Sequence, residues 1–230
     1  MHEFASSSVF FGVFVTLAAY FIGLKVRKRT GLSVMNPILI AVVLIVALLS
    51  ILHIDFSAYN QSAKLISSLL TPATICLAVP LYEQIELLKR HKKAIFLGVL
   101  SGVITSLLCV LMLCLLFGLD HASYVTLLPK SITTAIGIGV SEALGGYVSI
   151  TAAVIIITGI FGSIIVKGLL RLLGVTDPVA RGVAIGTASH AIGTTRAMEL
   201  GEIEGAMSGL SIVIAGVLTV IGASVFSMLL

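Results

Sequence analysis

The run AIFLGVLSGVITSLLCVLMLCLLFGL, from Ala94 to Leu119, contains no charged side chain. A helix needs about 20 apolar residues to cross a bilayer core about 30 Å thick. This run therefore predicts a transmembrane helix, and the basic cluster before it, at residues 89–93, predicts which end is cytoplasmic. The helix then runs outward to Asp120.

The whole composition agrees with a membrane protein. Of the 230 residues, 58% are apolar and 10% are charged, and the mean hydropathy is +1.19. An ordinary soluble domain is about 45–50% apolar and about 25% charged, so this chain lacks the polar surface to cover itself in water. The length leaves room for at most about eight spans and for no extramembrane catalytic domain. We therefore expect no enzyme.

The net charge of +4 is interpreted as a topology signal, so no nucleic-acid partner is implied. Cys76, Cys109 and Cys114 all lie in apolar runs, without a CxxC pair or a His at ligand spacing. The pattern favours neither a disulfide framework nor a metal site. No cofactor is expected.

Three further runs predict crossings before and after this helix, at Ala5–Leu24, Met35–Ile54 and Val148–Leu173. The first is followed by four basic residues between Lys25 and Arg29, which places the N-terminus outside the cytoplasm. The segment Ala206–Leu230 predicts the last span.

A shorter crossing, Leu65–Leu81, contains Pro72 and Pro80. A proline at membrane depth frees a backbone carbonyl, so we expect a helix break at Pro72. The prediction is an all-helical inner-membrane protein with six full spans. It forms one transmembrane domain, with N-terminal helices in residues 1–120 and a transport unit in residues 121–230.

Two segments are too polar for spans that face lipid. They are LPKSITTAIGIGVSEALGG, Leu128–Gly146, and DPVARGVAIGTASHAIGTTRAMELGEIE, Asp177–Glu204. We interpret both as re-entrant or broken helices. If each crossed fully instead, the chain would have eight spans, and Lys167 and Arg171 would face outward, which the positive-inside rule disfavours.

The two polar segments share a pattern, AIG followed by six residues and LG, at an offset of 56 residues. Each copy precedes a long apolar run, and one crossing between the copies would invert them. Inverted repeats with discontinuous helices are typical of secondary transporters. Gly137 and Gly193 are the expected break points of the two copies.

Arg196 is the strongest candidate for a substrate-binding residue. An isolated charge at membrane depth is costly and usually functional, and a guanidinium can bind a carboxylate with two hydrogen bonds. The alternative is a structural ion pair with Glu199, three residues further on.

Short polar side chains surround Arg196 in the sequence. Thr187, Ser189, Thr194 and Thr195 can bind a small hydroxy or keto acid, or they can satisfy the backbone of a broken helix. His190 can carry a proton coupled to anion movement, or it can be a neutral side chain bonded to a carbonyl.

In the first polar segment, four candidates follow Pro129, which suits a first helical turn that attracts an anion: Lys130, Ser131, Thr133 and Thr134. Lys130 lines the entrance of the site or extends to the outer interface. Glu142 is expected to be buried and to pair with Arg196 or Lys130, so that Glu142, Glu199 and His190 are the proton or ion-pair candidates.

The two polar segments resemble the LrgB/CidB family of bacterial membrane proteins. That resemblance implies a separate small LrgA/CidA-like membrane partner. It implies either a carrier of small monocarboxylates, as in the related plastid glycolate/glycerate translocator, or a holin/antiholin-like protein that modulates murein hydrolases and cell lysis. A homodimer in the lipid bilayer is a further expectation.

Overall fold

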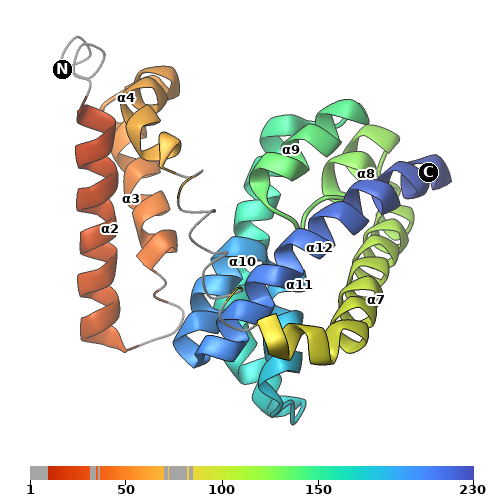
Figure 1. Ribbon diagram of the computed structural model, residues 1–230. Coiled ribbons are helices and arrows are strands. Elements are labelled where there is room, and N and C mark those ends of the chain that lie inside the picture. Colours follow the sequence, from red (N-terminus) through yellow and green to blue (C-terminus); the bar gives the residue numbers. More distant parts are fainter. Residues whose placement is uncertain (1–9, 32–34, 36, 70–71, 73–81, 83–84) are drawn as a thin grey trace. The chain divides into compact units, whose positions relative to one another are not determined.

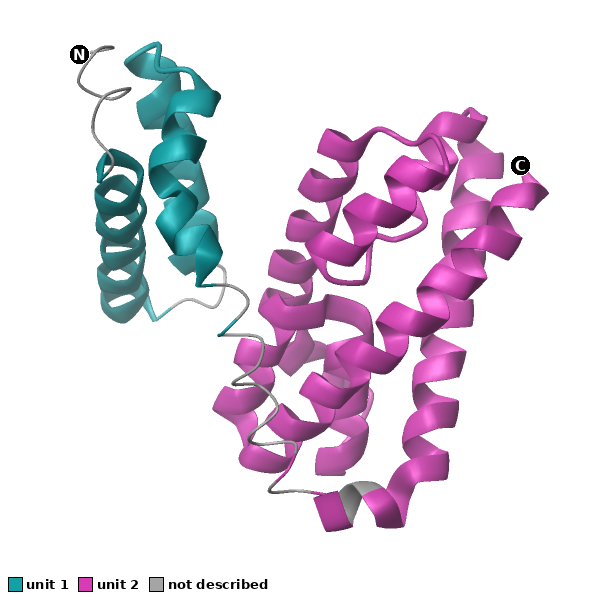
Figure 2. Cartoon of the chain, turned by 45° about the horizontal axis from the view of Figure 1, so that its top comes forward, with its two compact units in different colours: residues 1–76 teal, residues 77–230 magenta. Residues whose placement is uncertain are grey.

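The computed structural model describes residues 10–31, 35, 37–69, 72, 82 and 85–230 (Figure 1). The described residues form helices and no strand, as the sequence predicts. They divide into two compact units, Met1–Cys76 and Leu77–Leu230, coloured separately in Figure 2. This division falls before the long apolar helix, and the subdivision of the transmembrane domain at residue 120 stays a prediction.

The first unit consists of α2 (Phe11–Thr30), α3 (Pro37–Ile51) and α4 (Phe56–Ser68). Helix α2 packs on both of the others. The backbone N–H of Gly12 donates to Ser62 Oγ at 2.9 Å, and the hydroxyls of Thr16 and Tyr59 lie 2.7 Å apart. These bonds fasten α2 to α4 through small and polar side chains.

The second unit begins with α7 (Ile85–Phe117) and α8 (His121–Leu127) and continues with α9 (Thr134–Ala143) and α10 (Val148–Leu172). It ends with α11 (Pro178–Leu200), α12 (Glu202–Phe226) and the short η1 (Ser227–Leu229). Helix α11 packs on α12, α10 and α7. The core of the unit contains Val99, Tyr124 and Met207, all fully buried.

Three of the described helical segments are long and apolar enough to cross a membrane: Lys89–Phe117, Val148–Leu172 and Glu202–Leu229. They match three of the six predicted spans. Helix α3 is apolar but has only 15 residues. Most of the predicted crossing at 65–81, including Pro80, lies outside the described residues. Helix α4 covers its start and ends at Ser68, and only Leu69 and Pro72 are described within the rest.

Glycine explains how closely α11 approaches its neighbours. An added Cβ at Gly182 would lie 2.6 Å from the Glu204 carbonyl oxygen of α12, and one at Gly186 would overlap the Ser208 backbone. From α10, a Cβ at Gly159 would lie 2.6 Å from the His190 ring. Small residues at a helix interface allow backbones to pack at short range, as in many membrane bundles.

The two polar segments differ in how they leave the helical path. The first, Leu128–Gly146, follows helix α8 and consists of a turn at residues 128–133 and helix α9. The second is α11, whose backbone is interrupted at His190, with φ 41° and ψ −143°. Each segment leads into a long apolar helix, α10 after the first and α12 after the second.

Candidate functional site

A cavity of about 420 Å³ lies between α7, the turn before α9, and α11. Lys130 and Ser131 line it from the first polar segment, and Thr187 lines it from the second. The remaining lining residues are Gly98, Gly102, Thr105, Ser106, Cys109, Ala184 and Ala188. The structure thus brings together three of the predicted substrate-binding residues from segments more than 50 positions apart.

Lys130 is the cation of this cavity. Its Nζ donates to Ser131 Oγ at 3.0 Å, and that oxygen lies 3.2 Å from Ser106 Oγ. Within the described residues, no carboxylate forms an ion pair with Lys130. The cavity therefore combines one positive charge with hydroxyl groups.

The turn that presents Lys130 is fixed by its neighbours. Leu128 and Ile132 are each 1% exposed, so they anchor the chain on both sides of the lysine. The backbone N–H of Ile132 donates to the Pro129 carbonyl at 3.3 Å. Helix α9 begins only at Thr134, so Lys130 lies in a turn and not in the first helical turn that Pro129 suggests in the sequence.

A second cavity, of about 300 Å³, shares Gly98 and Ala184 with the first. It extends along α7 and α11 to His91 and Asp177. We call the two together the α7–α11 groove. An added Cβ at Gly102 would lie 2.7 Å from Thr187 Cγ2, so glycine allows the two helices to approach beside this groove.

The polar groups at the helix break of His190 form hydrogen bonds within the protein. His190 Nε2 lies 2.9 Å from the Ile155 carbonyl oxygen, and Thr194 Oγ1 donates to the His190 carbonyl at 3.0 Å. Thr194 Oγ1 also lies 2.7 Å from Ser208 Oγ. His190, Thr194 and the neighbouring Ser189 are buried, and none of them lines the α7–α11 groove.

Arg196 forms an ion pair with Glu199, which is the structural alternative considered for it in the sequence. Thr195 is exposed, and its hydroxyl donates to the Ile192 carbonyl at 2.8 Å. Neither Arg196 nor Thr195 lines the groove. The charge of Arg196 is therefore turned toward a carboxylate on its own helix.

The other candidates of the first segment lie apart from the cavity as well. Thr133 is the N-cap of α9 and Thr134 its first residue. Glu142 is exposed near the end of α9, where burial was expected, and it takes part in neither of the two ion pairs seen among described side chains. Gly137 continues the helix of α9, and the break in α11 falls three residues before Gly193.

None of the site residues predicted from the sequence lies in α7, although this helix lines the cavity. Gly98, Gly102, Thr105 and Cys109 follow one another at helical spacing and share one face of α7. Small and hydroxyl side chains repeated on one face of an apolar helix are the signal that could have found them. Within the described part of the chain, no group of three metal-binding side chains occurs.

The model of the LrgB-like family matches residues 16–229. The chain belongs to the LrgB-like family. It is 37% identical to the antiholin-like protein LrgB of Bacillus cereus (strain B4264) over 222 residues, which cover 94% of this chain and 95% of that protein. The antiholin-like protein LrgB of Bacillus anthracis (strain CDC 684 / NRRL 3495) matches with the same identity and coverage. No solved structure matches the chain.

Membership of the LrgB-like family agrees with the apolar helices in identifying a membrane protein. The Lys130 cavity combines one ammonium group with several hydroxyl groups, and it is the starting point for the proposed function.

Proposed function

We propose that this LrgB-family protein carries small monocarboxylates of the pyruvate, glycolate or glycerate type across the bacterial cell membrane, together with an LrgA/CidA-like partner. The observation that carries the proposal is the position of Lys130 in a cavity of about 420 Å³. Ligand sites are typically concave, mostly apolar and equipped with a few placed polar groups.

The chemistry of the cavity suits a small hydroxy or keto acid. The Lys130 ammonium has three donors, of which one is used by Ser131, so it can also bind a carboxylate. Ser106 and Thr105 supply hydroxyls that donate to or accept from a keto or hydroxy oxygen. A monocarboxylate balances the single positive charge.

The α7–α11 groove supplies the route in this proposal. It extends from the Lys130 cavity past Gly98 and Ala184 to His91, which lies within the basic cluster at residues 89–93 that the sequence places in the cytoplasm. Rocking of the helices around α11 then opens the cavity alternately to the two sides. The break at His190 is the place where α11 can bend, because its backbone is already non-helical there.

Lys130 replaces Arg196 as the residue proposed to hold the substrate charge. The Arg196 guanidinium is already neutralised by Glu199, so a carboxylate bound there would compete with an existing ion pair. Thr187, Ser131 and Lys130 form the proposed binding set, while His190 and Thr194 maintain the broken helix.

The second candidate function is control of cell lysis through protein interaction. It is favoured by the name of the similar Bacillus proteins, which are called antiholin-like. In this function the polar segments contact an LrgA/CidA-like partner, and no substrate passes through the groove.

Uptake of labelled pyruvate, glycolate and glycerate into proteoliposomes tests both functions. The protein is reconstituted alone and with its LrgA/CidA-like partner, with and without a proton gradient. We compare the wild type with Lys130→Gln, Lys130→Arg and Arg196→Gln.

A carrier with its site at Lys130 shows saturable uptake that falls about tenfold or more in Lys130→Gln, as expected when a charge-assisted hydrogen bond is lost. Lys130→Arg retains the charge and part of the uptake, and Arg196→Gln retains most of it. Uptake that is lost in Arg196→Gln and kept in Lys130→Gln would move the site to the second half of α11. No uptake in any condition, combined with altered partner binding and lysis timing, would favour the antiholin-like function.

A further inference from the structure

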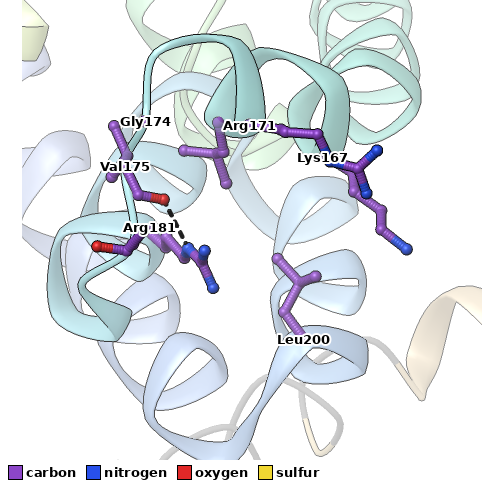
Figure 3. A pocket seen from close by; sticks show the side chains of 8 residues that line it. Lys167, Arg171, Gly174, Val175, Arg181 and Leu200 are labelled. Atoms are coloured by element: carbon purple, nitrogen blue, oxygen red, sulfur yellow. Dashed lines mark hydrogen bonds between the residues drawn. The ribbon is translucent and has the colours of Figure 1, made fainter.

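A separate cavity of about 230 Å³ lies where α10 connects to α11 (Figure 3). Lys167 and Arg171 reach it from α10, and Arg181 reaches it from α11. Its other lining residues are Leu170, Gly174, Val175, Thr176 and Leu200. Three cationic side chains thus surround a cavity that no carboxylate lines, within the part of the chain that the structure describes.

Arg181 is held in place by the protein. Its Nε donates to the Val175 carbonyl at 2.9 Å, and one of its terminal nitrogens lies 3.7 Å from a carboxylate oxygen of Glu204. The Glu204 side chain is only 7% exposed. A guanidinium has five N–H donors, so Arg181 keeps donors for an oxyanion in the cavity.

Lys167 and Arg171 are four residues apart on α10, and like charges at this spacing destabilise a helix. Neither of them is paired with a carboxylate among the described residues. Glu204 offsets one of the three charges, so two positive charges remain around the cavity. A bound anion would remove this repulsion.

We propose that Lys167, Arg171 and Arg181 bind a phosphate group. Arginine matches the oxygens of phosphate with paired hydrogen bonds, and the excess of positive charge suits a phosphate better than a monocarboxylate. The site lies at the end of an apolar helix, where basic pockets meet lipid headgroups. The phosphate belongs to an anionic phospholipid or is free in solution, and this proposal does not depend on the carboxylate carrier.

The test compares binding of phosphatidylglycerol, phosphatidylcholine, inorganic phosphate and pyruvate to the full chain purified in detergent. Native mass spectrometry measures retained lipid, and thermal unfolding measures stabilisation by phosphate or pyruvate. The variant is Lys167→Gln with Arg171→Gln. The control is Lys89→Gln with Lys92→Gln, which removes the same charge from α7 at residues that do not line the cavity.

We expect the Lys167 and Arg171 variant to bind phosphatidylglycerol or phosphate about tenfold more weakly, and the control to bind as the wild type does. Preference for phosphatidylglycerol over both phosphatidylcholine and inorganic phosphate identifies a lipid as the source. Stabilisation by inorganic phosphate without lipid preference identifies a soluble phosphate.

Equal binding by the variant and the control would overturn the proposal, and so would stabilisation by pyruvate as strong as that by phosphate. Circular dichroism verifies that each variant is helical. If the double variant does not fold, Lys167→Gln alone changes one exposed side chain, and the proposal still requires weaker binding than in Lys89→Gln.

Discussion

The Nε2 atom of His190 in α11 lies 2.9 Å from the carbonyl oxygen of Ile155 in α10. A carbonyl oxygen only accepts hydrogen bonds, so Nε2 carries the proton in this contact. The bond is made at the residue where α11 leaves the helical path. A contact between two helices thus stabilises the break. His190 therefore has a structural role, whether or not it also carries a proton.

Replacing His190 with glycine or alanine tests this structural role, because the order of the two melting temperatures should be the reverse of that in a regular helix. In a regular helix, glycine is about 1 kcal/mol less favourable than alanine. At φ 41° alanine is strained and glycine is not, so we expect His190→Gly to melt at a higher temperature than His190→Ala. Both should melt below the wild type, because both lose the bond to Ile155.

Circular dichroism at increasing temperature, on protein in detergent, measures the melting temperatures of the two His190 variants and so their order. At Ala184, in the helical part of α11, the wild type carries alanine, and it should melt at a higher temperature than Ala184→Gly. His190→Ala melting above His190→Gly would mean that the backbone is helical at this position.

Two glycines of α10 predict opposite effects of adding one methyl group. An alanine at Gly162 would overlap Ser189 Oγ and Cβ in α11, whereas no atom lies within 4 Å of an added Cβ at Gly168. Overpacking costs about 1–3 kcal/mol, and relief of glycine's helix penalty gains about 1 kcal/mol. We expect Gly162→Ala to lower the melting temperature and Gly168→Ala to raise it slightly.

Equal melting temperatures for the two α10 variants would show that α10 and α11 are not packed at this distance. The comparison is well matched, since both sites are in one helix and receive the same side chain.

The composition of residues 177–204 predicted an interrupted helix, but it did not locate the interruption. Gly193 was the natural choice because glycine tolerates unusual backbone angles. In the structure an added Cβ at Gly193 would lie 2.5 Å from Ser189 Cβ, so this glycine serves close packing. The break falls at His190 because of its bond to Ile155, and a contact between residues 35 positions apart is not visible in a local pattern.

The candidate site was predictable where its residues stand out in composition. Lys130 and Thr187 were found because a lysine and a threonine are conspicuous in polar segments of an apolar chain. Ser106 and Gly102 were missed because the segment Ala94–Leu119 has an apolar average, although one face of it is small and polar. Arg196 was the strongest candidate because of its charge at predicted membrane depth, and in the structure it forms the ion pair with Glu199 that was its stated alternative.

The start of α8 predicts a dependence of stability on pH. Asp120 Oδ1 accepts a hydrogen bond from the Ser123 backbone N–H at 3.1 Å, and hydrogen bonds from Ser123 hold the pKa of Asp120 below its ordinary value of 3.8. A carboxyl with a lowered pKa stabilises the folded state above its ordinary pKa, and this contribution is lost as the pH falls through the folded value.

Asp120→Asn removes this titration and keeps an acceptor for the Ser123 N–H. We therefore expect the difference in melting temperature between wild type and Asp120→Asn to shrink as the pH is lowered below about 4. Parallel melting curves for wild type and Asp120→Asn at every pH would contradict the prediction.

Ala184 lies where the two cavities of the α7–α11 groove meet, and it is exposed. Ala184→Phe should narrow the groove with little effect on folding, because substitutions at exposed sites usually change stability by about 0.5 kcal/mol or less. If the groove is the route to Lys130, the maximal uptake rate falls while the melting temperature stays constant. Ala191→Phe is the control, since Ala191 is an exposed residue of α11 that lines neither cavity.

Chemical labelling of Cys109 tests whether Ala184→Phe narrows the α7–α11 groove, and it requires no transport assay. This thiol lines the Lys130 cavity and is exposed, whereas Cys114 is buried. With Cys76 and Cys114 replaced by serine, a water-soluble maleimide supplied from the His91 side should label Cys109 more slowly in Ala184→Phe than in Ala191→Phe. Equal labelling rates would show that Cys109 is reached by another path, because a bulky ring at Ala184 obstructs any molecule that moves along the groove.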